Sequence, residues 1–218
     1  MLDVISCLER LDKLLVAADL GQFVLFNKAY LIVTRSIQQA IREDYFKNPA
    51  FIEKFIVNFA SYYFQAVNLT VSDDVSLSLP WAKLNEYATQ KSAPVFISLL
   101  LGANAHINND LPQVLVKLLG EEKGEGLLKD LVKIDKLLMK SGRQIIGVFD
   151  EKNSFLDFLK RRLQFTYYRP AMYTILYWRI RAWQSYRLLK RNEHAMPSVT
   201  RKTIGTANRL LKIAKILG

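Results

Sequence analysis

The sequence predicts an all-α fold, a single-domain orthogonal bundle of about eight helices spanning residues 1–218. Apolar residues recur at intervals of three and four, as in Leu8, Leu11 and Leu15 and again in Phe26, Tyr30 and Val33. Half of the residues are hydrophobic, whereas only nine Gly and six Pro occur. This composition favours a packed core, and the length suits one domain.

Each predicted helix has its own apolar spacing or start signal. Pro49, Pro80 and Pro94 suit first helical turns because the fixed φ of proline is already helical there. The segments 69–79 and 120–126 are predicted loops. The predicted helices include residues 8–15 and 23–33, about 49–68, one from each of Pro80 and Pro94, 127–139, 153–164, 171–190 and, as a basic amphipathic C-terminal helix, about 198–217.

Cysteine content and uncharged runs bear on location. Cys7 is the only cysteine, so neither an intramolecular disulfide nor a cysteine-based zinc cage can form. The first ten residues lack the layout of a secretory signal. The uncharged runs 55–72 and 92–109 contain several Asn and Gln residues, which favours buried helices over lipid-spanning ones. We therefore expect a cytoplasmic protein that can lie at the membrane periphery.

The main candidate site lies in residues 100–112, an apolar run that contains His106 and Asp110. Residues four apart share one face of a helix, so these side chains can touch or share a ligand. Asn104 lies on the same segment. Pro112 has no backbone N–H to donate to the Asn108 carbonyl, so the helix should kink or restart here. The sequence names Asn104, His106 and Asp110 as candidate catalytic residues facing an internal cleft.

Three interpretations of this pair stay open. In the first, His106 and Asp110 form an internal structural hydrogen bond. In the second, they are two ligands of one divalent metal ion, zinc, iron or manganese. The remaining ligands would then be carboxylates, with Glu86, Asp130 and Asp135 as candidates. In the third, Asp110 orients His106 as a general base.

Several aromatic residues of the predicted helices could either line a pocket beside the pair or pack in the hydrophobic core. Trp81, Trp183, Tyr62 and Tyr63 could line such a pocket, although aromatic residues at helical spacing usually pack in the core. No Gly-x-Ser-x-Gly elbow, Walker loop or dinucleotide fingerprint occurs in the sequence. Common nucleotide and acyl-transfer chemistries are therefore not expected.

The segment 100–112, together with residues 59–66 and 181–183, resembles a bacterial family of uncharacterised all-helical proteins with an Asn-Ala-His-Ile-x-x-Asp-Leu signature. The resemblance implies the helical fold and the importance of the site, but no reaction. The His-x-x-x-Asp spacing is also similar to that of helical zinc-dependent phospholipases C and related nucleases. Those enzymes use several histidines, whereas the only other histidine here is His194, which excludes their trinuclear zinc site.

The basic residues are concentrated at the C-terminal end. Residues 160–218 contain fourteen Lys and Arg and one acid, Glu193. The last predicted helix places Ile204, Leu211, Ala214 and Leu217 opposite Arg209, Lys212 and Lys215. Such a surface can meet phosphates of an anionic membrane or, as a weaker alternative, of nucleic acid.

Two functions follow from these features. The first is an enzyme, metal-dependent or His/Asp-dependent and hydrolase-like or lyase-like, that acts on an anionic or lipid-like substrate. The second is a non-catalytic helical binding protein that uses its basic C-terminal helices on membrane or nucleic acid. In that case His106 and Asp110 are a structural pair.

Overall fold

The computed structural model describes residues 2–71, 78–88, 95–121, 126–148 and 168–217 of the chain. These residues are helical apart from short turns, and no strand occurs among them. The all-α prediction is therefore confirmed. The α-helices are α1 (Leu2–Ala17), α2 (Gly21–Arg42), α3 (Pro49–Val71), α4 (Leu79–Ala88), α5 (Val95–Asn104), α6 (Leu111–Glu121), α7 (Leu127–Gly147), α9 (Arg169–Arg191) and α10 (Met196–Leu217).

The helix boundaries follow the start signals in the sequence. Pro49 is the first residue of α3, and Pro170 lies in the first turn of α9. The helix α7 continues past the predicted end at Met139 to Gly147, because Ser141, Gly142, Ile145 and Ile146 extend its buried face. The helix predicted for residues 153–164 and most of the predicted loop 69–79 lie outside the described residues.

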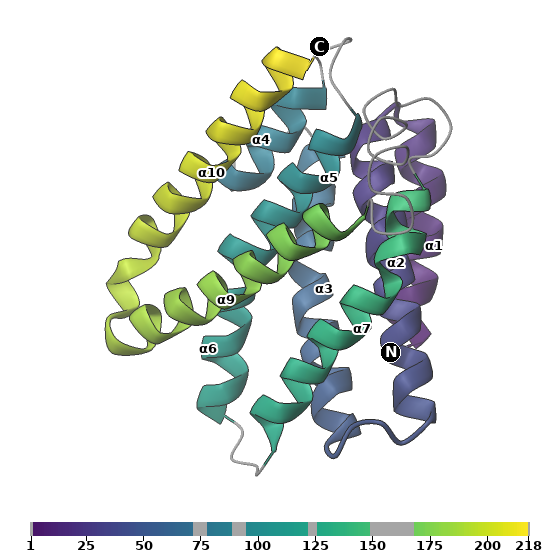
Figure 1. Cartoon of the computed structure of the whole chain (residues 1–218), viewed down its shortest axis with the longest axis vertical. Helices are drawn as coiled ribbons and strands as arrows, with labels where there is room; N and C mark the ends of the chain where they lie inside the picture. The colour runs from purple at the N-terminus through teal and green to yellow at the C-terminus, as the bar shows by residue number, and fades with distance from the viewer. Residues whose placement is uncertain (1, 72–77, 89–94, 122–125, 149–167, 218) are drawn as a thin grey trace.

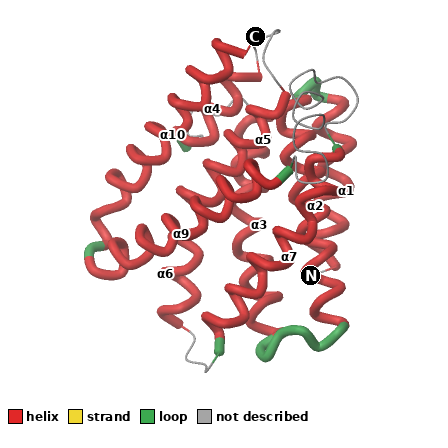
Figure 2. The backbone as a smooth tube through the Cα atoms, viewed as in Figure 1, coloured by secondary structure: helices red, strands yellow, loops and turns green. Residues whose placement is uncertain are grey.

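Figure 1 shows how the helices surround the middle of the chain. The helices α1 and α2 lie side by side, and α9 crosses in front of the segment that contains α5 and α6. The helix α10 returns from the end of α9 and packs on α4 and α5 (Figures 1 and 2). The segment of residues 95–121 is therefore enclosed by helices from both ends of the chain.

The hydrophobic core runs through this enclosed segment and includes side chains from α1 to α10. Its centre is aromatic: the Phe26 ring lies edge-on to those of Tyr63 and Trp81, with centroids 5.0 and 5.4 Å apart. Gly102 allows α5 to approach α2 here, because a Cβ at this position would lie 2.7 Å from the Phe26 ring. No helix in the described ranges combines enough length and hydropathy to cross a bilayer.

A buried carboxylate fixes the start of α3 against α7. Asp130 accepts hydrogen bonds from the backbone N–H groups of Lys47 and Asn48, at 3.1 and 2.7 Å. The ammonium group of Lys133 also donates to it, at 2.9 Å. An anion at a helix N-terminus satisfies free N–H groups and complements the helix dipole. This anchor holds α3, which supplies one wall of the site described next.

Candidate functional site

The candidate site lies on a π-helix, Ala105–Asp110, between α5 and α6. The Leu111 N–H donates to the His106 carbonyl, five residues back. In an α-helix the Pro112 ring would clash with the Asn108 carbonyl and leave it without its donor, and the wider π turn is one way to absorb this conflict. The predicted interruption at Pro112 is therefore a widened turn, not a break in the helix. The Gln113 side chain donates to the Asn109 carbonyl at 2.9 Å.

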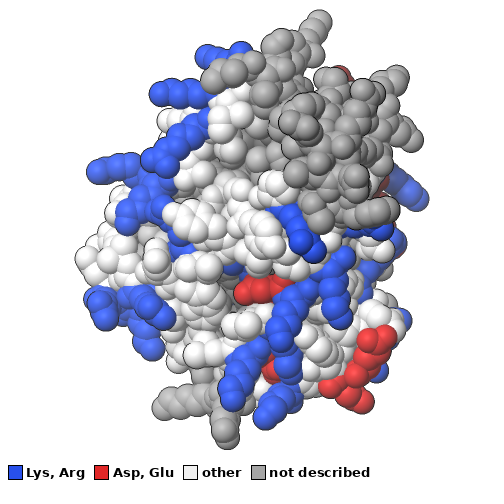
Figure 3. All heavy atoms as spheres, viewed as in Figure 1, with Lys and Arg blue, Asp and Glu red and all other residues white. Residues whose placement is uncertain are grey.

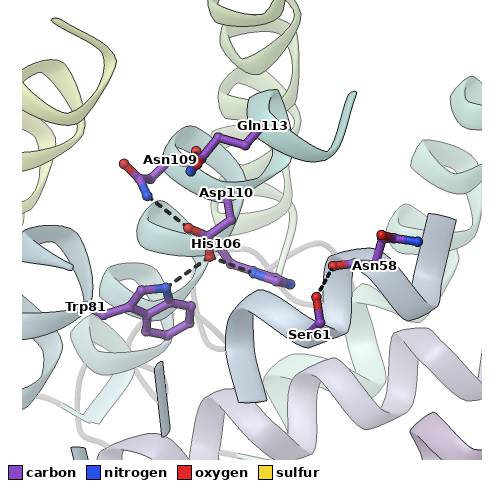
Figure 4. Close-up of polar contacts among 7 residues, drawn as sticks. All are labelled: Asn58, Ser61, Trp81, His106, Asn109, Asp110 and Gln113. Carbon is purple, nitrogen blue, oxygen red and sulfur yellow. Dashed lines mark hydrogen bonds and ion pairs between the residues drawn. The ribbon is translucent and has the colours of Figure 1, made fainter. Parts of the chain in front are cut away.

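His106 and Asp110 contact one another on this π-helix, as their spacing predicts. The Nδ1 atom of His106 lies 3.2 Å from Oδ2 of Asp110. The Trp81 indole N–H donates to the same oxygen at 2.9 Å, and the Asn109 amide donates to Oδ1 at 2.9 Å. Figure 4 shows these three donors converging on the carboxylate. Because Asp110 accepts at both oxygens, we assign the His106 proton to Nδ1.

Aromatic rings enclose the His106 imidazole. The ring of Phe59, from α3, lies parallel to it, with centroids 3.6 Å apart and planes 7° apart. The rings of Phe26 and Tyr30, from α2, present their edges at 5.7 and 5.0 Å. Tyr63 lies farther away, at 6.3 Å. The imidazole is therefore held by packing on its faces and by Asp110 at one nitrogen.

The second imidazole nitrogen, Nε2, is buried and has no hydrogen-bond partner within the described part of the chain. It points away from Asp110 (Figure 4). Burial lowers the pKa of His106 despite the hydrogen bond to Asp110, and the charge of Arg179 lowers it further. His106 is therefore neutral at pH 7, with a free lone pair on Nε2.

Two tyrosine hydroxyls near His106 are also buried without a partner in the described residues, those of Tyr30 and Tyr63. Burial raises the pKa of Tyr30, and the negative charge of Asp110 raises it further. Burial likewise raises the pKa of Tyr63 well above its usual value. Both phenols therefore stay protonated hydrogen-bond donors, and Tyr30 also lines the cavity beside His106.

An apolar cavity of about 80 Å³ adjoins His106. Side chains from α2, α3, α5, α7 and α9 line it, and almost all of them are buried. Its polar lining comes from His106, Tyr30 and Arg179, and the guanidinium of Arg179 forms a partly buried ion pair with Asp135. The cavity is partly open, and of Asn104, His106 and Asp110, which were expected to face an internal cleft, only His106 lines it. A ligand would meet hydrocarbon on most sides and only a few polar groups.

Asn104 and Asn108 make their contacts on another side of the π-helix. The Asn108 amide donates to the Asn104 carbonyl oxygen at 2.9 Å, and Asn104 donates to the backbone carbonyl of Thr203 at 3.0 Å. Thr200 donates to Asn109 at 3.1 Å. These bonds join the π-helix to α10. The structure therefore places Asn104 at a helix contact and outside the cavity lining.

The donor set does not fit the predicted metal ion. No group of three or more His, Cys, Asp or Glu side chains that could hold a metal occurs in the described ranges. Both oxygens of Asp110 are already occupied by donors. Of the expected further ligands, Asp130 anchors α3, Asp135 pairs with Arg179, and Glu86 pairs with Lys83 at 2.6 Å. Each of the three candidate carboxylates therefore has another partner in the structure, and the described residues provide no complete ligand set around His106.

The aromatic residues expected near the site divide into two groups. Trp81 and Tyr63 lie beside His106, whereas Trp183 packs on Tyr186, also on α9, with centroids 5.6 Å apart. Phe59, Tyr30 and Arg179 were not expected at the site from the sequence. The sequence does contain a signal for Tyr30 and Phe59, because each is four residues from another aromatic residue, Phe26 and Tyr63 respectively, and so shares a helix face with it. Arg179 gives no comparable signal.

Fold and site together define an all-helical protein with a buried His–Asp pair on a π-helix beside an apolar cavity. The chain belongs to a family of unknown function, DUF5995, whose model matches residues 1–216. No curated protein and no solved structure matches the chain.

Proposed function

We propose that this protein is a His106/Asp110-dependent enzyme, hydrolase-like or lyase-like, that acts on a small lipid-like molecule bound in the apolar cavity. One observation carries the proposal: Nε2 of the neutral His106 is buried without a partner, while Nδ1 is bound to Asp110. A buried acceptor without a donor costs about 1–3 kcal/mol. A ligand that donates to Nε2 would remove this cost.

The cavity supports an apolar ligand. A hydrocarbon group that fills an apolar space of 80 Å³ gains up to about 2 kcal/mol. The volume is roughly half that of an engineered cavity that binds benzene, so a few carbon atoms fill it. Of the anionic and lipid-like substrates that the sequence allows, the lining favours the lipid-like class, because Asp135 already neutralises Arg179.

The chemical step common to both reaction types is proton removal by Nε2. In hydrolysis, His106 takes a proton from water as its oxygen attacks the carbonyl carbon, and returns it to the leaving oxygen as the bond to carbon breaks. In elimination, it takes the proton from carbon as the leaving group departs with the bonding electrons. Asp110 holds the required tautomer, and Tyr30 can donate to the oxygen that gains negative charge. Asn104 would act only by positioning the π-helix.

Binding can be tested separately from turnover. We expect 1-butanol to shift the His106 imidazole signals in NMR spectra, because its hydroxyl can donate to Nε2. Its donor-free counterpart, 1-chlorobutane, should shift the signals of the apolar lining but produce a smaller change at the imidazole. The exposed His194 is the internal control in each spectrum. Equal imidazole shifts with both compounds would contradict a donor site at Nε2.

Turnover can be measured with 4-nitrophenyl esters of increasing chain length. His106→Gln should abolish hydrolysis, and Asp110→Asn should lower it by about 10²–10⁴-fold, because the wrong tautomer is then favoured. His194→Gln is the matched control and should behave as the wild type. The wild-type rate should rise with pH through a pKa below the usual histidine value. Butanol binding without turnover of these esters or of eliminable substrates would support the alternative of a binding protein.

A further inference from the structure

The outer face of α9 carries a line of large apolar side chains in contact with solvent. Tyr173, Tyr177 and Ile180 are 56, 55 and 59% exposed. Their spacing of four and three residues places them on one side of the helix. The opposite side of α9 is buried in the core and includes Ile175 and Ala182. The helix therefore presents apolar side chains both to the core and to solvent.

Basic residues accompany these exposed apolar side chains on α9. The helix α9 contains six Lys and Arg and no acidic residue. Arg179 is buried against Asp135, but the other five have no ion pair with an acid in the described ranges. Arg187 and Arg191 lie on the same side as Ile180, seven and eleven residues farther along. The exposed stripe is therefore apolar in its first half and cationic in its second.

The helix α10, which follows α9 after a short turn, is also basic. It contains no acidic residue, and Arg209, Lys212 and Lys215 are exposed. In Figure 3, the spheres over α10 and the adjoining end of α9 are blue and white, without red.

The apolar face that the sequence assigned to a membrane contact on α10 lies largely against the bundle. Ala214 is buried, and Ile204 and Leu211 are half-buried. The position of Leu217's side chain falls outside the described residues. The larger exposed apolar contact is therefore on α9, whereas α10 contributes cations and one exposed aliphatic side chain, Ile213.

We propose that the outer face of α9, with the basic edge of α10, docks on an anionic lipid membrane. Interfacial helices pair Tyr and aliphatic side chains, which enter the headgroup region, with Lys and Arg, which meet lipid phosphates. A second copy of the chain would bring two cationic faces together, which electrostatic repulsion opposes. Nucleic acid would use the cations but gives no role to an exposed Ile180. The proposed membrane contact does not depend on the proposed enzymatic activity at His106.

Vesicle flotation tests the proposal with the full chain. We expect the protein to float with vesicles of equal phosphatidylcholine and phosphatidylglycerol and not with phosphatidylcholine alone. Binding should weaken as salt is added, because the Debye length falls below about 10 Å above 0.1 M. The triple variant Y173S/Y177S/I180S should bind at least about tenfold more weakly, since its apolar insertion is lost. The matched control V57S/L128S/V132S, exposed on α3 and α7, should bind as the wild type does.

A second variant keeps the proposal falsifiable if the triple variant does not fold. Arg187→Gln with Arg191→Gln should weaken binding about fivefold for each charge removed. Absence of binding to anionic vesicles overturns the proposal, as does equal binding by the folded triple variant. Binding of duplex DNA that the triple variant retains, with no vesicle binding, would assign the face to nucleic acid. Dimerisation that depends on Tyr173 and Ile180 would assign it to a second copy.

Discussion

The Phe59 ring lies flat against the His106 imidazole, with centroids 3.6 Å apart. The two residues come from α3 and from the π-helix, so this contact links the anchor at the start of α3 to the candidate site. Burial makes the neutral imidazole the stable form, and a neutral ring stacks on an aromatic face without a desolvated charge. The packing and the burial of His106 therefore favour the same state, a neutral imidazole held in one orientation.

The first prediction concerns Trp81, whose N–H donates to Asp110 at 2.9 Å. Trp81→Phe removes this donor from a buried carboxylate but keeps an aromatic ring. We expect a loss of about 1.5–3 kcal/mol in the free energy of unfolding, the usual value for a hydrogen bond to a charged group. Chemical denaturation measures it. Trp183→Phe, a half-buried Trp outside the site, should cost less, and equal losses would contradict the importance of the bond to Asp110.

The sequence predicted the contact between His106 and Asp110 because four residues is close to one turn in either an α-helix or a π-helix. Pro112 predicted a distortion, but not its form. The residues that contact this pair could not be predicted from the sequence. Trp81 and Phe59 come from helices distant in the chain, and their positions depend on the packing of the whole core. Likewise, an acid such as Asp130 shows no sign in the sequence that it anchors a helix N-terminus. The cavity is space left by packing, which no sequence pattern encodes.

The second prediction is a pH dependence of stability that arises from His106. The pKa of His106 is lower in the folded protein than in the unfolded chain, so between the two values the unfolded chain binds more protons. The free energy of unfolding should therefore be highest above about pH 6.5, the usual histidine pKa, and should fall as the pH is lowered. Thermal melts at a series of pH values would record this. His106→Gln should flatten the dependence in this range.

His194 provides the control for that experiment because it is exposed, on the turn before α10. His194→Gln should leave the slope of stability against pH as in the wild type. A wild-type slope in the His106→Gln variant would mean that other groups cause the dependence.

The third prediction concerns the close approach of α5 and α2 at Gly102. A Cβ there would lie 2.7 Å from the Phe26 ring, which itself lies edge-on to His106. Gly102→Ala should therefore lower stability by about 1–3 kcal/mol through overpacking. Gly205→Ala in α10 is the matched control, because nothing lies within 4 Å of its added Cβ. It should raise stability by about 0.5–1 kcal/mol, since Ala favours a helix interior over Gly.

The Phe26 ring allows an internal check on this explanation. In a Phe26→Leu background the smaller side chain leaves room for the new methyl group. Gly102→Ala should then cost less than it does in the wild type. An equal cost in both backgrounds would place the clash elsewhere.

The fourth prediction concerns Asp130 as a structural anchor. Burial alone would raise the pKa of Asp130, but the hydrogen bonds from Lys133, Lys47 and Asn48 outweigh it, so that the pKa is lowered. Its contribution to stability is therefore present above the unfolded-state pKa and is lost as the pH falls through the lower folded value. Asp130→Asn replaces one acceptor oxygen by an NH₂ group, which faces donors. At neutral pH we expect a loss of about 2–3 kcal/mol, measured by denaturation.

The acid dependence separates this anchor from a general effect of removing one negative charge. As Asp130 in the wild type becomes protonated, it also loses acceptor capacity, so the difference between wild type and Asp130→Asn should shrink toward low pH. Asp44→Asn is the control, because Asp44 is exposed and its left-handed φ of 52° is one that Asn also adopts. That variant should remain within about 0.5 kcal/mol of the wild type. A constant difference between wild type and Asp130→Asn down to strongly acidic pH would contradict a role for the carboxylate charge, because only the charged form accepts at both oxygens.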